Sequence, residues 1–216
     1  MMFADTDMKK FIARPLLEWY EKNGRDYPWR RSRDSYKVLI AEIMLQRTKA
    51  DQVLPVYLSF IRKFPTVQKL SRASLEEVRS YFDRLGLMWR AGLVKRLAEE
   101  LINRFDGRVP ENRSELLSLP SVGEYMADAV LSFALGEDVA VIDANVCRVI
   151  GRIFGLKSRG EARRNKQFRY VAQRIVPKGK ARRLNWAIID LAALVCTPKN
   201  PRCNMCPLRE RCSFYR

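Results

Sequence analysis

Apolar residues recur at spacings of three and four along most of the chain, and the strict alternation typical of a half-buried strand is nearly absent. This pattern predicts about ten short amphipathic helices. Turn signals such as Asn23-Gly24, Asp106-Gly107 and Pro177-Lys178-Gly179 separate them. The sequence therefore predicts an all-α protein, with helices expected at 11–19, 38–45, 53–64, 75–82, 91–105, 115–119, 127–135, 146–154 and 184–195.

Several of these segments begin with a residue that favours a helix start. Ser71 and Ser74 precede one apolar segment, and Asn112 precedes another. Asp143 follows four apolar residues and precedes a periodic segment, so the pattern by itself favours an N-cap role, which Asn145 would serve equally well. A functional role for Asp143 would require a carboxylate near developing positive charge, as on a sugar that loses its leaving group.

The charge balance points to a polyanionic partner. Lys and Arg number 41 against 24 acidic residues, a formal net charge of +17. The segment 157–183 holds eleven basic residues and one acid, so the charge is concentrated. Such a field concentrates nucleic acid, although a basic surface can also serve solubility or a hot habitat. We see no bilayer-length apolar run and no secretory leader, and expect a cytoplasmic protein without a membrane partner.

The chain contains no histidine. Ser-His and Cys-His nucleophiles and histidine metal ligands are therefore excluded. Any acid/base chemistry must use carboxylates, tyrosine, lysine or cysteine.

Four of the five cysteines form a C-x6-C-x2-C-x5-C array near the end of the sequence. Thiolates at such short, unequal intervals favour one inorganic centre held by one loop. The spacing favours a [4Fe-4S] cluster over a four-cysteine zinc site, which usually pairs two short knuckles, and disulfides fit least well. The expected ligands are Cys196, Cys203, Cys206 and Cys212, whereas Cys147 is expected to pack in the core.

A Pro- and Gly-bearing turn, Leu119-Pro-Ser-Val-Gly123, lies between two expected helices. A helix-hairpin-helix turn of this kind can direct free backbone N–H groups toward a phosphate without reading any base. The same letters also describe an ordinary turn. Ser121, Val122 and Gly123 are the candidate phosphate contacts.

Three features together resemble the endonuclease III/MutY superfamily of helix-hairpin-helix DNA glycosylases. They are the hairpin LPSVGEY, the segment VIDANVCRV and the cysteine array. The resemblance runs from about Tyr27 to Cys212. It implies a two-domain fold, with a six-helix domain at 29–137 and a cluster domain built from 1–28 and 138–216. It also implies a monomeric prokaryotic enzyme, associated with the nucleoid, that acts on a nucleotide flipped out of double-stranded DNA.

By this resemblance Asp143 matches the family's catalytic aspartate, which stabilises the oxocarbenium-like sugar. Glu42 matches the acid with which MutY-like enzymes protonate the departing base. Its other possible roles are an exposed helix position or a buried carboxylate held by Arg47 or another basic residue. Tyr125 stands where bifunctional members place a lysine, and a phenol cannot form a Schiff base. Base removal without strand cleavage is therefore expected, because no motif supports Lys49 or Lys95 as a substitute.

The resemblance also assigns DNA contacts. Leu87 matches an apolar wedge beside the extruded nucleotide, and Arg47 a residue that fills the vacated space. Without the resemblance, Leu87 would be a core residue and Arg47 a solvated charge. Tyr27, Trp29 and Arg30 are expected to line the base pocket or, alternatively, to anchor the domain junction. The full set of expected DNA contacts is Gln46, Arg47, Leu87, Ser121, Val122, Gly123 and Asn145.

Two subfamilies fit this pattern. The thymine/uracil mismatch glycosylases of thermophilic archaea share the YPWR start, the glutamate of IAEIML and the tyrosine at position 125. MutY-type adenine glycosylases share Glu42 but carry serine in place of Tyr125, and Gln46 resembles their MLQQT. We favour removal of T or U opposite G, and adenine opposite G or 8-oxoguanine is the alternative. Asp143 and Glu42 argue against a third class, a non-catalytic iron-sulfur DNA-binding protein.

One residue of the hairpin departs from the family pattern, because Ser121 replaces the glycine that is usual there.

Overall fold

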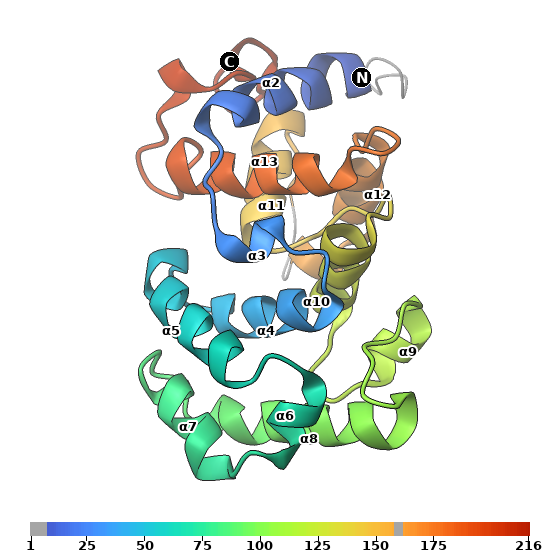
Figure 1. Cartoon of the computed structure of the whole chain (residues 1–216). Coiled ribbons are helices and arrows are strands. Elements are labelled where there is room, and N and C mark those ends of the chain that lie inside the picture. Colours follow the sequence, from blue (N-terminus) through green and yellow to red (C-terminus); the bar gives the residue numbers. More distant parts are fainter. Residues whose placement is uncertain (1–7, 158–161) are drawn as a thin grey trace. The chain divides into compact units, whose positions relative to one another are not determined.

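The computed structural model of the chain describes residues 8–157 and 162–216. Helices are the only regular elements in these two ranges, so the all-α prediction is confirmed (Figure 1). The helices form two compact units. One unit is continuous and spans Asp26–Leu135, and the other combines the chain up to Arg25 with Gly136–Arg216. From the sequence we expected the corresponding boundaries at residues 29 and 137.

In the continuous unit, helix α4 (Ser35–Leu45) is apolar on nearly every side, and eight of its residues are buried. Asp34 caps it by accepting hydrogen bonds from the backbone N–H groups of Tyr36 and Lys37. It packs against α5 (Ala50–Lys63) and α10 (Glu124–Ala129). The other helices of this unit are α3 (Pro28–Arg31), α6 (Val67–Arg72), α7 (Leu75–Asp83), α8 (Trp89–Phe105), α9 (Arg113–Ser118) and the π-helix η2 (Val130–Leu135).

Two expected helix starts in this unit are confirmed. Ser74 accepts a hydrogen bond from the Glu77 N–H, and the Glu77 side chain accepts one from the Ser74 N–H, which completes a capping box for α7. The Asn112 side chain accepts from the Glu115 N–H at the start of α9. Ser71 lies inside α6 and donates to the Gln68 carbonyl, so it starts no helix.

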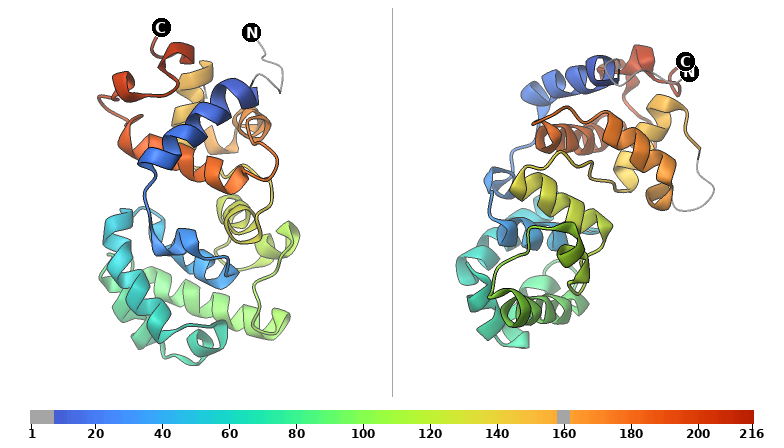
Figure 2. Two further views of the ribbon diagram at one scale, coloured as in Figure 1. Left: turned by 45° about the horizontal axis from the view of Figure 1, so that its top comes forward. Right: turned by 90° about the vertical axis from the view of Figure 1, so that its right-hand side faces the viewer.

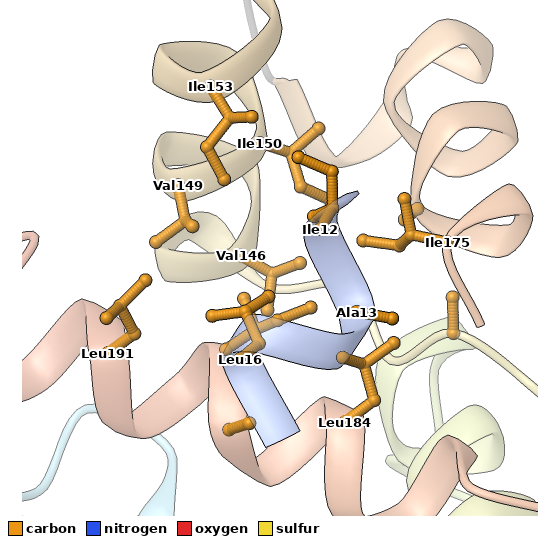
Figure 3. Packing of buried hydrophobic residues seen from close by; sticks show 14 of the residues in the cluster. Ile12, Ala13, Leu16, Val146, Val149, Ile150, Ile153, Ile175, Leu184 and Leu191 are labelled. Atoms are coloured by element: carbon orange, nitrogen blue, oxygen red, sulfur yellow. The ribbon is translucent and has the colours of Figure 1, made fainter. Parts of the chain in front are cut away.

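The second unit is built around α2 (Arg14–Asn23), α11 (Ala144–Phe154) and α13 (Ala181–Leu194). Helix α13 packs against both α2 and α11, and both views of Figure 2 show α2 beside α13. Figure 3 shows Leu16, Ile150 and Leu184 meeting in the shared core, where each is at most 1% exposed. Burial of such side chains is the main source of stability here. The unit also contains η1 (Lys9–Ala13), η3 (Ala162–Arg164), α12 (Lys166–Arg174), η4 (Cys203–Met205) and η5 (Arg209–Arg211).

Among the described residues, three α-helices were not expected from the apolar pattern: α3, α6 and α12. Helix α3 has four residues and α6 has six, which is too short to display a period. Helix α12 is mostly polar and basic, and only Phe168 and Ala172 in it are buried. Among the described residues, no helix has both the length and the apolar character needed to cross a membrane.

Each unit contains a carboxylate that is almost completely removed from solvent. The Asp190 side chain accepts hydrogen bonds from the Arg25 backbone N–H and Nε, at 2.8 and 2.7 Å. In the other unit, the Arg113 Nε lies 3.1 Å from Asp128 Oδ1. Because an unpaired buried charge is costly, these arginines compensate for the desolvation of the two carboxylates.

Candidate functional site

Glu42 and Tyr125 meet where α4 packs against α10. Glu42 is 5% exposed in the middle of α4, and Tyr125 is half-buried in the first turn of α10. The Tyr125 hydroxyl donates a hydrogen bond of 2.8 Å to Glu42 Oε2. The structure thus brings together two residues that the resemblance assigned to the chemistry. The bond fixes the orientation of a carboxyl group that α4 holds among apolar neighbours.

The three residues expected at the base pocket form a packed aromatic group. The rings of Tyr27 and Trp29 stack at 4.7 Å, and Trp29 meets Tyr57 edge-on at 5.2 Å. The Tyr27 hydroxyl donates to Asp51 at 2.8 Å, and the Arg30 guanidinium lies 5.6 Å from the centre of the Tyr27 ring. Tyr27, Trp29 and Arg30 are all at most 9% exposed. Their observed role is therefore packing within this unit, and contact with a substrate base stays a prediction.

The expected hairpin turn connects α9 to α10. Leu119 and Val122 are buried and anchor it, while Ser121 and Gly123 are exposed. Ser121 has a left-handed backbone, with φ of 67°, which an L-residue adopts at a cost. Gly123 has an ordinary φ of −97°, and a Cβ added there would meet no atom within 4 Å. The backbone requirement for glycine in this turn therefore falls on position 121, which carries serine.

A second turn follows α4 and contains the expected DNA contacts Gln46 and Arg47. The Gln46 side-chain nitrogen lies 2.9 Å from the sulfur of Met126, so this amide is directed toward α10. Arg47 is exposed and has a left-handed φ of 62°. Arg90, which sequence reasoning did not single out, donates from Nη1 to the carbonyls of Ile43 and Gln46, both at 2.8 Å. Arg90 therefore holds the end of α4 against the start of α8.

Leu87, the expected wedge, lies in the turn between α7 and α8. It is 8% exposed, so its side chain packs inside the unit as a core residue. Its N–H donates to the Phe82 carbonyl at 2.9 Å, which ties the turn to the end of α7. Insertion of Leu87 into DNA stays a prediction and would require this side chain to leave its packed position.

In the other unit, Asp143 is the N-cap of α11, as the sequence pattern favoured. Its Oδ1 accepts a hydrogen bond from the Val146 N–H at 2.7 Å. Its Oδ2 accepts one from the Asn145 side-chain amide at 2.9 Å. The carboxylate is part-exposed and directly follows the buried residues Val141 and Ile142. Capping and a catalytic role are compatible, because a carboxylate oxygen keeps a further lone pair after accepting one hydrogen bond.

Asn145 and Arg148 connect Asp143 to the cysteine segment. Arg148 Nη1 donates to the Asn145 side-chain oxygen at 2.9 Å, and Arg148 Nε donates to the Cys196 carbonyl at 3.0 Å. Arg148 Nη2 also bonds the Ala192 carbonyl at 3.0 Å. Asn145 was expected to contact DNA, yet here both ends of its amide serve this chain of hydrogen bonds. These hydrogen bonds were not predicted, although the spacing of three between Asn145 and Arg148, which places them on one helix face, is visible in the sequence.

The four cysteines of the array line one small cavity, together with Arg152, Arg209 and Phe214. All five cysteines carry free thiols. Burial first, and then the negative charges of the other three cysteines of the array, raise the pKa of Cys206 to about 11. Among the described residues, no three His, Cys, Asp or Glu side chains are arranged to hold a metal ion. Thiols from Cys196, Cys203, Cys206 and Cys212 on one cavity nevertheless form a donor set of the kind that binds iron-sulfur clusters.

Arg152, on α11, contacts both ends of this cysteine segment. Its Nη1 lies 3.4 Å from the Cys196 sulfur and donates to the Thr197 carbonyl at 2.7 Å. Its own backbone carbonyl accepts from the Cys212 thiol at 3.3 Å and from the Phe214 N–H at 3.0 Å. Its guanidinium lies 4.5 Å from the centre of the Phe214 ring. Sequence reasoning missed Arg152, because nothing in the cysteine spacing names the residue that holds the loop.

Cys147 is separate from this cavity. It is 4% exposed in the core around α11, as expected for a packing residue. Burial raises the pKa of its thiol to about 11, with a further contribution from Asp143. It is therefore a poor nucleophile at neutral pH.

The basic run at 157–183 falls partly on residues 158–161, which lie outside the described residues. In the described part of the run, α12 and its flanks carry exposed basic side chains at positions that include Arg163, Arg164 and Lys166. Arg183 is paired with Glu21 at 2.8 Å, so part of the run serves the surface of the fold.

Residues 40–177 match the family model of the HhH-GPD superfamily base excision DNA repair proteins. The chain is 39% identical to a thymine/uracil-DNA glycosylase of Pyrobaculum aerophilum over 93% of its own length and 90% of the relative's. It superposes with a TM-score of 0.92 on a solved thermostable thymine-DNA glycosylase, at 36% identity and over 99% of both chains. It is also 34% identical to an adenine DNA glycosylase of Buchnera aphidicola, of which it covers 58%. The chain therefore belongs to the HhH-GPD superfamily of base excision DNA repair proteins.

Proposed function

We propose that this protein removes thymine or uracil mispaired with guanine, by hydrolysing the N-glycosidic bond of a nucleotide flipped out of double-stranded DNA. The observation that carries the proposal is the Asp143 carboxylate, held by hydrogen bonds to both oxygens. Full-length similarity to thymine/uracil-DNA glycosylases supports the choice of base. The net charge of +17 supports a DNA partner.

Asp143 is the proposed catalytic carboxylate. Cleavage of an N-glycosidic bond develops positive charge on the sugar, and an ionised carboxylate held nearby stabilises that charge. The bonds from Val146 and Asn145 remove the need to reorganise the group during the reaction. Water then completes the hydrolysis at the sugar.

Glu42 is the proposed contact to the departing base. Thymine lacks the purine N7 that an acid would protonate, so Glu42 is assigned to hydrogen bonding with the pyrimidine edge. The bond from Tyr125 presents the carboxyl group in one orientation. Selectivity for a mispaired base also comes from the lower cost of extruding it, roughly a few kcal/mol less than for a paired base.

Tyr125 makes strand cleavage through position 125 unavailable, because a phenol forms no Schiff base. Lys95 is a poor substitute, since its amine donates to the Ser71 carbonyl at 2.7 Å and lies 3.8 Å from Glu99. Lys49 directly precedes α5, and no sequence motif supports it as a nucleophile. The proposed activity is therefore base removal alone.

Removal of adenine opposite G or 8-oxoguanine is the second candidate. Gln46, which follows α4 as in the adenine enzymes' MLQQT, favours it, and so does Glu42. The tyrosine at position 125 and the higher identity to the thymine/uracil enzyme argue for the pyrimidine substrate.

The four array cysteines are proposed to hold a [4Fe-4S] cluster. They fit it because all four line one cavity and none is tied up in a disulfide. Such a cluster supplies a covalent cross-link among segments 196–212. Arg148 and Arg152 then hold this cross-linked segment against α11, whose first residue follows Asp143. Iron and zinc analysis of purified protein separates the cluster from a zinc site.

We further propose a monomeric enzyme of a prokaryotic nucleoid, adapted to a hot habitat. The hot habitat is supported by similarity to a solved thermostable thymine-DNA glycosylase.

The direct test of base choice is single-turnover cleavage of four duplexes that differ only in the central pair: G·T, G·U, A·G and A·8-oxoguanine. The proposal expects base loss from the G·T and G·U duplexes and little from the other two. Faster removal of adenine would replace it with the second candidate.

A further inference from the structure

A cavity of about 710 Å³ lies beside α11 in the second unit. It extends along one face of α11 from Ala144 to Gly155, and residues of η3, α12 and the C-terminal segment also line it. Helix α11 packs against both η3 and α12, so this unit builds the space by itself. No cysteine of the array lines it, which separates it from the cysteine cavity. Its volume is within the range of small-molecule sites, about 300 to 1,000 Å³. Below it is called the α11 cavity.

The charged side chains that line the α11 cavity are basic. They are Arg148, Arg152, Lys157 and Arg163, and the described lining residues include no Asp or Glu. Arg148 and Arg152 are held in place, because each donates to a backbone carbonyl of the cysteine segment, at 3.0 and 2.7 Å. Burial raises the pKa of the Cys147 thiol, and the charge of Arg163 partly opposes this rise, so Arg163 lies near the wall that Cys147 forms. Positive charges gathered without acids favour an anionic ligand.

Two phenylalanines also line the α11 cavity. A Cβ added at Gly151 would lie 3.3 Å from the ring of the buried Phe168, so glycine on α11 leaves room for that ring in the wall. Phe214 is 55% exposed, and the Arg152 guanidinium lies 4.5 Å from the centre of its ring. An exposed ring beside a fixed cation offers a stacking surface to a planar group. The lining therefore suits a ligand that joins a planar ring to several negative charges.

We propose that the α11 cavity binds a free nucleoside triphosphate. Its phosphates lie among the basic side chains, with Lys157 and Arg163 as the main contacts, and its base stacks on Phe214. A strand of DNA brings one negative charge per nucleotide, whereas a triphosphate brings several charges to one place, as a lining with four cations requires. The inference goes beyond the proposed function, because binding at this cavity involves no cleavage of a glycosidic bond.

The first test measures the phosphate contacts. Isothermal titration calorimetry of the full chain with dATP, at physiological salt, compares the wild type with Arg163→Glu and Arg164→Glu. Arg164 is exposed and directly follows Arg163 but does not line the cavity, so it is the matched control. We expect Arg163→Glu to weaken dATP binding roughly tenfold or more, because a charged hydrogen-bond donor is lost. Arg164→Glu should weaken it about twofold or less, since salt screens exposed charges that make no contact.

The second test separates recognition of the base from recognition of charge. Inorganic tripolyphosphate carries the charges of dATP without the ring, and the wild type should bind it more weakly than dATP. Phe214→Ala should weaken dATP binding roughly fivefold or more, because a stacked base is lost, and should leave tripolyphosphate binding unchanged. Phe214→Tyr keeps the ring and should bind dATP like the wild type. Thermal melting of each variant checks that the fold is intact.

The inference is overturned if the wild type binds no dATP, if it binds tripolyphosphate as tightly, or if Arg163→Glu and Arg164→Glu lose affinity equally. It is also overturned if a short single-stranded oligonucleotide displaces dATP with the same dependence on Arg163, because the site would then belong to a DNA strand. A wild-type protein that binds dATP here but releases neither T nor U from DNA would contradict the proposed function alone.

Discussion

The phenolic oxygen of Tyr125 lies 2.8 Å from Oε2 of Glu42 and donates a hydrogen bond to it, across 83 positions of sequence. This contact brings the first turn of α10 to the middle of α4. The two residues were matched to the family separately, and in the structure the Tyr125 phenol orients the buried Glu42 carboxyl group. Its consequences for base removal are open to measurement.

Glu42→Gln should slow G·T excision by roughly 100-fold or more, because it removes the carboxyl group that contacts the base. Tyr125→Phe should slow it less, by about tenfold, since the acid remains and only its orientation is lost. Single-turnover rates at saturating enzyme measure both. Tyr36→Phe is the matched control, because the Tyr36 hydroxyl donates at 2.8 Å to the Phe64 carbonyl in the same unit. If Glu42→Gln excises thymine at the wild-type rate, Glu42 has no role in the reaction.

Ser121→Gly should stabilise the protein by about 1 kcal/mol, because glycine adopts a left-handed backbone without the Cβ penalty. The φ of 67° at Ser121 is the reason. Thermal or denaturant unfolding measures the change. Gly123→Ala is the companion variant, and with φ of −97° and open space around it, it should be tolerated. A lower melting temperature for Ser121→Gly would mean that the serine hydroxyl outweighs the backbone cost.

Arg152→Gln should release the cluster faster when a chelator is added, because Arg152 contacts Cys196 and Thr197 with its side chain. The measurements are iron per chain and the decay of visible absorbance. A shift of the cluster potential is also expected, since N–H groups near cluster sulfurs tune it. Arg209→Gln makes the same charge change beside the same cavity and should behave like the wild type. Equal iron retention in both variants would contradict the role given to Arg152, whereas a wild-type protein without iron would contradict the cluster itself.

Borohydride trapping should yield little covalent complex between the wild-type protein and DNA, because position 125 offers a phenol and the Lys95 amine is already bonded. A lysine-bearing bifunctional member of the family supplies the positive control. Efficient trapping of this protein would show that another amine has taken over and that strand cleavage occurs.

Much of the helical layout could be predicted from the sequence, since long apolar periods such as 91–105 and the caps Ser74, Asn112 and Asp143 are local signals. Helix α12 escaped prediction because its residues are mostly polar and only two of them are buried. The exposure of Met88 and Trp89, which follow the buried Leu87 in the sequence, also escaped prediction, because an apolar run does not say which of three consecutive large residues faces the core.

The residues of the candidate site likewise divide into those that could be named from the sequence and those that only the fold reveals. The four cysteines were named from their spacing, whereas Asp143, Glu42 and Tyr125 were named from the family resemblance, since their local pattern alone assigns them no chemistry. Arg90, Arg148 and Arg152 were not, because an arginine that bonds distant carbonyls leaves no local pattern. These arginines hold the segments that carry the motif residues, so the supporting contacts had to come from the fold.

The role of Asp143 in cleaving the glycosidic bond is tested most directly by Asp143→Asn, measured for duplex binding and for single-turnover release of T and U. Asparagine is a good N-cap, so α11 should keep its start and the variant its stability. We expect binding like that of the wild type, and excision slower by roughly 1,000-fold, because the charge that stabilises the sugar is gone. Excision by Asp143→Asn at the wild-type rate would contradict this account.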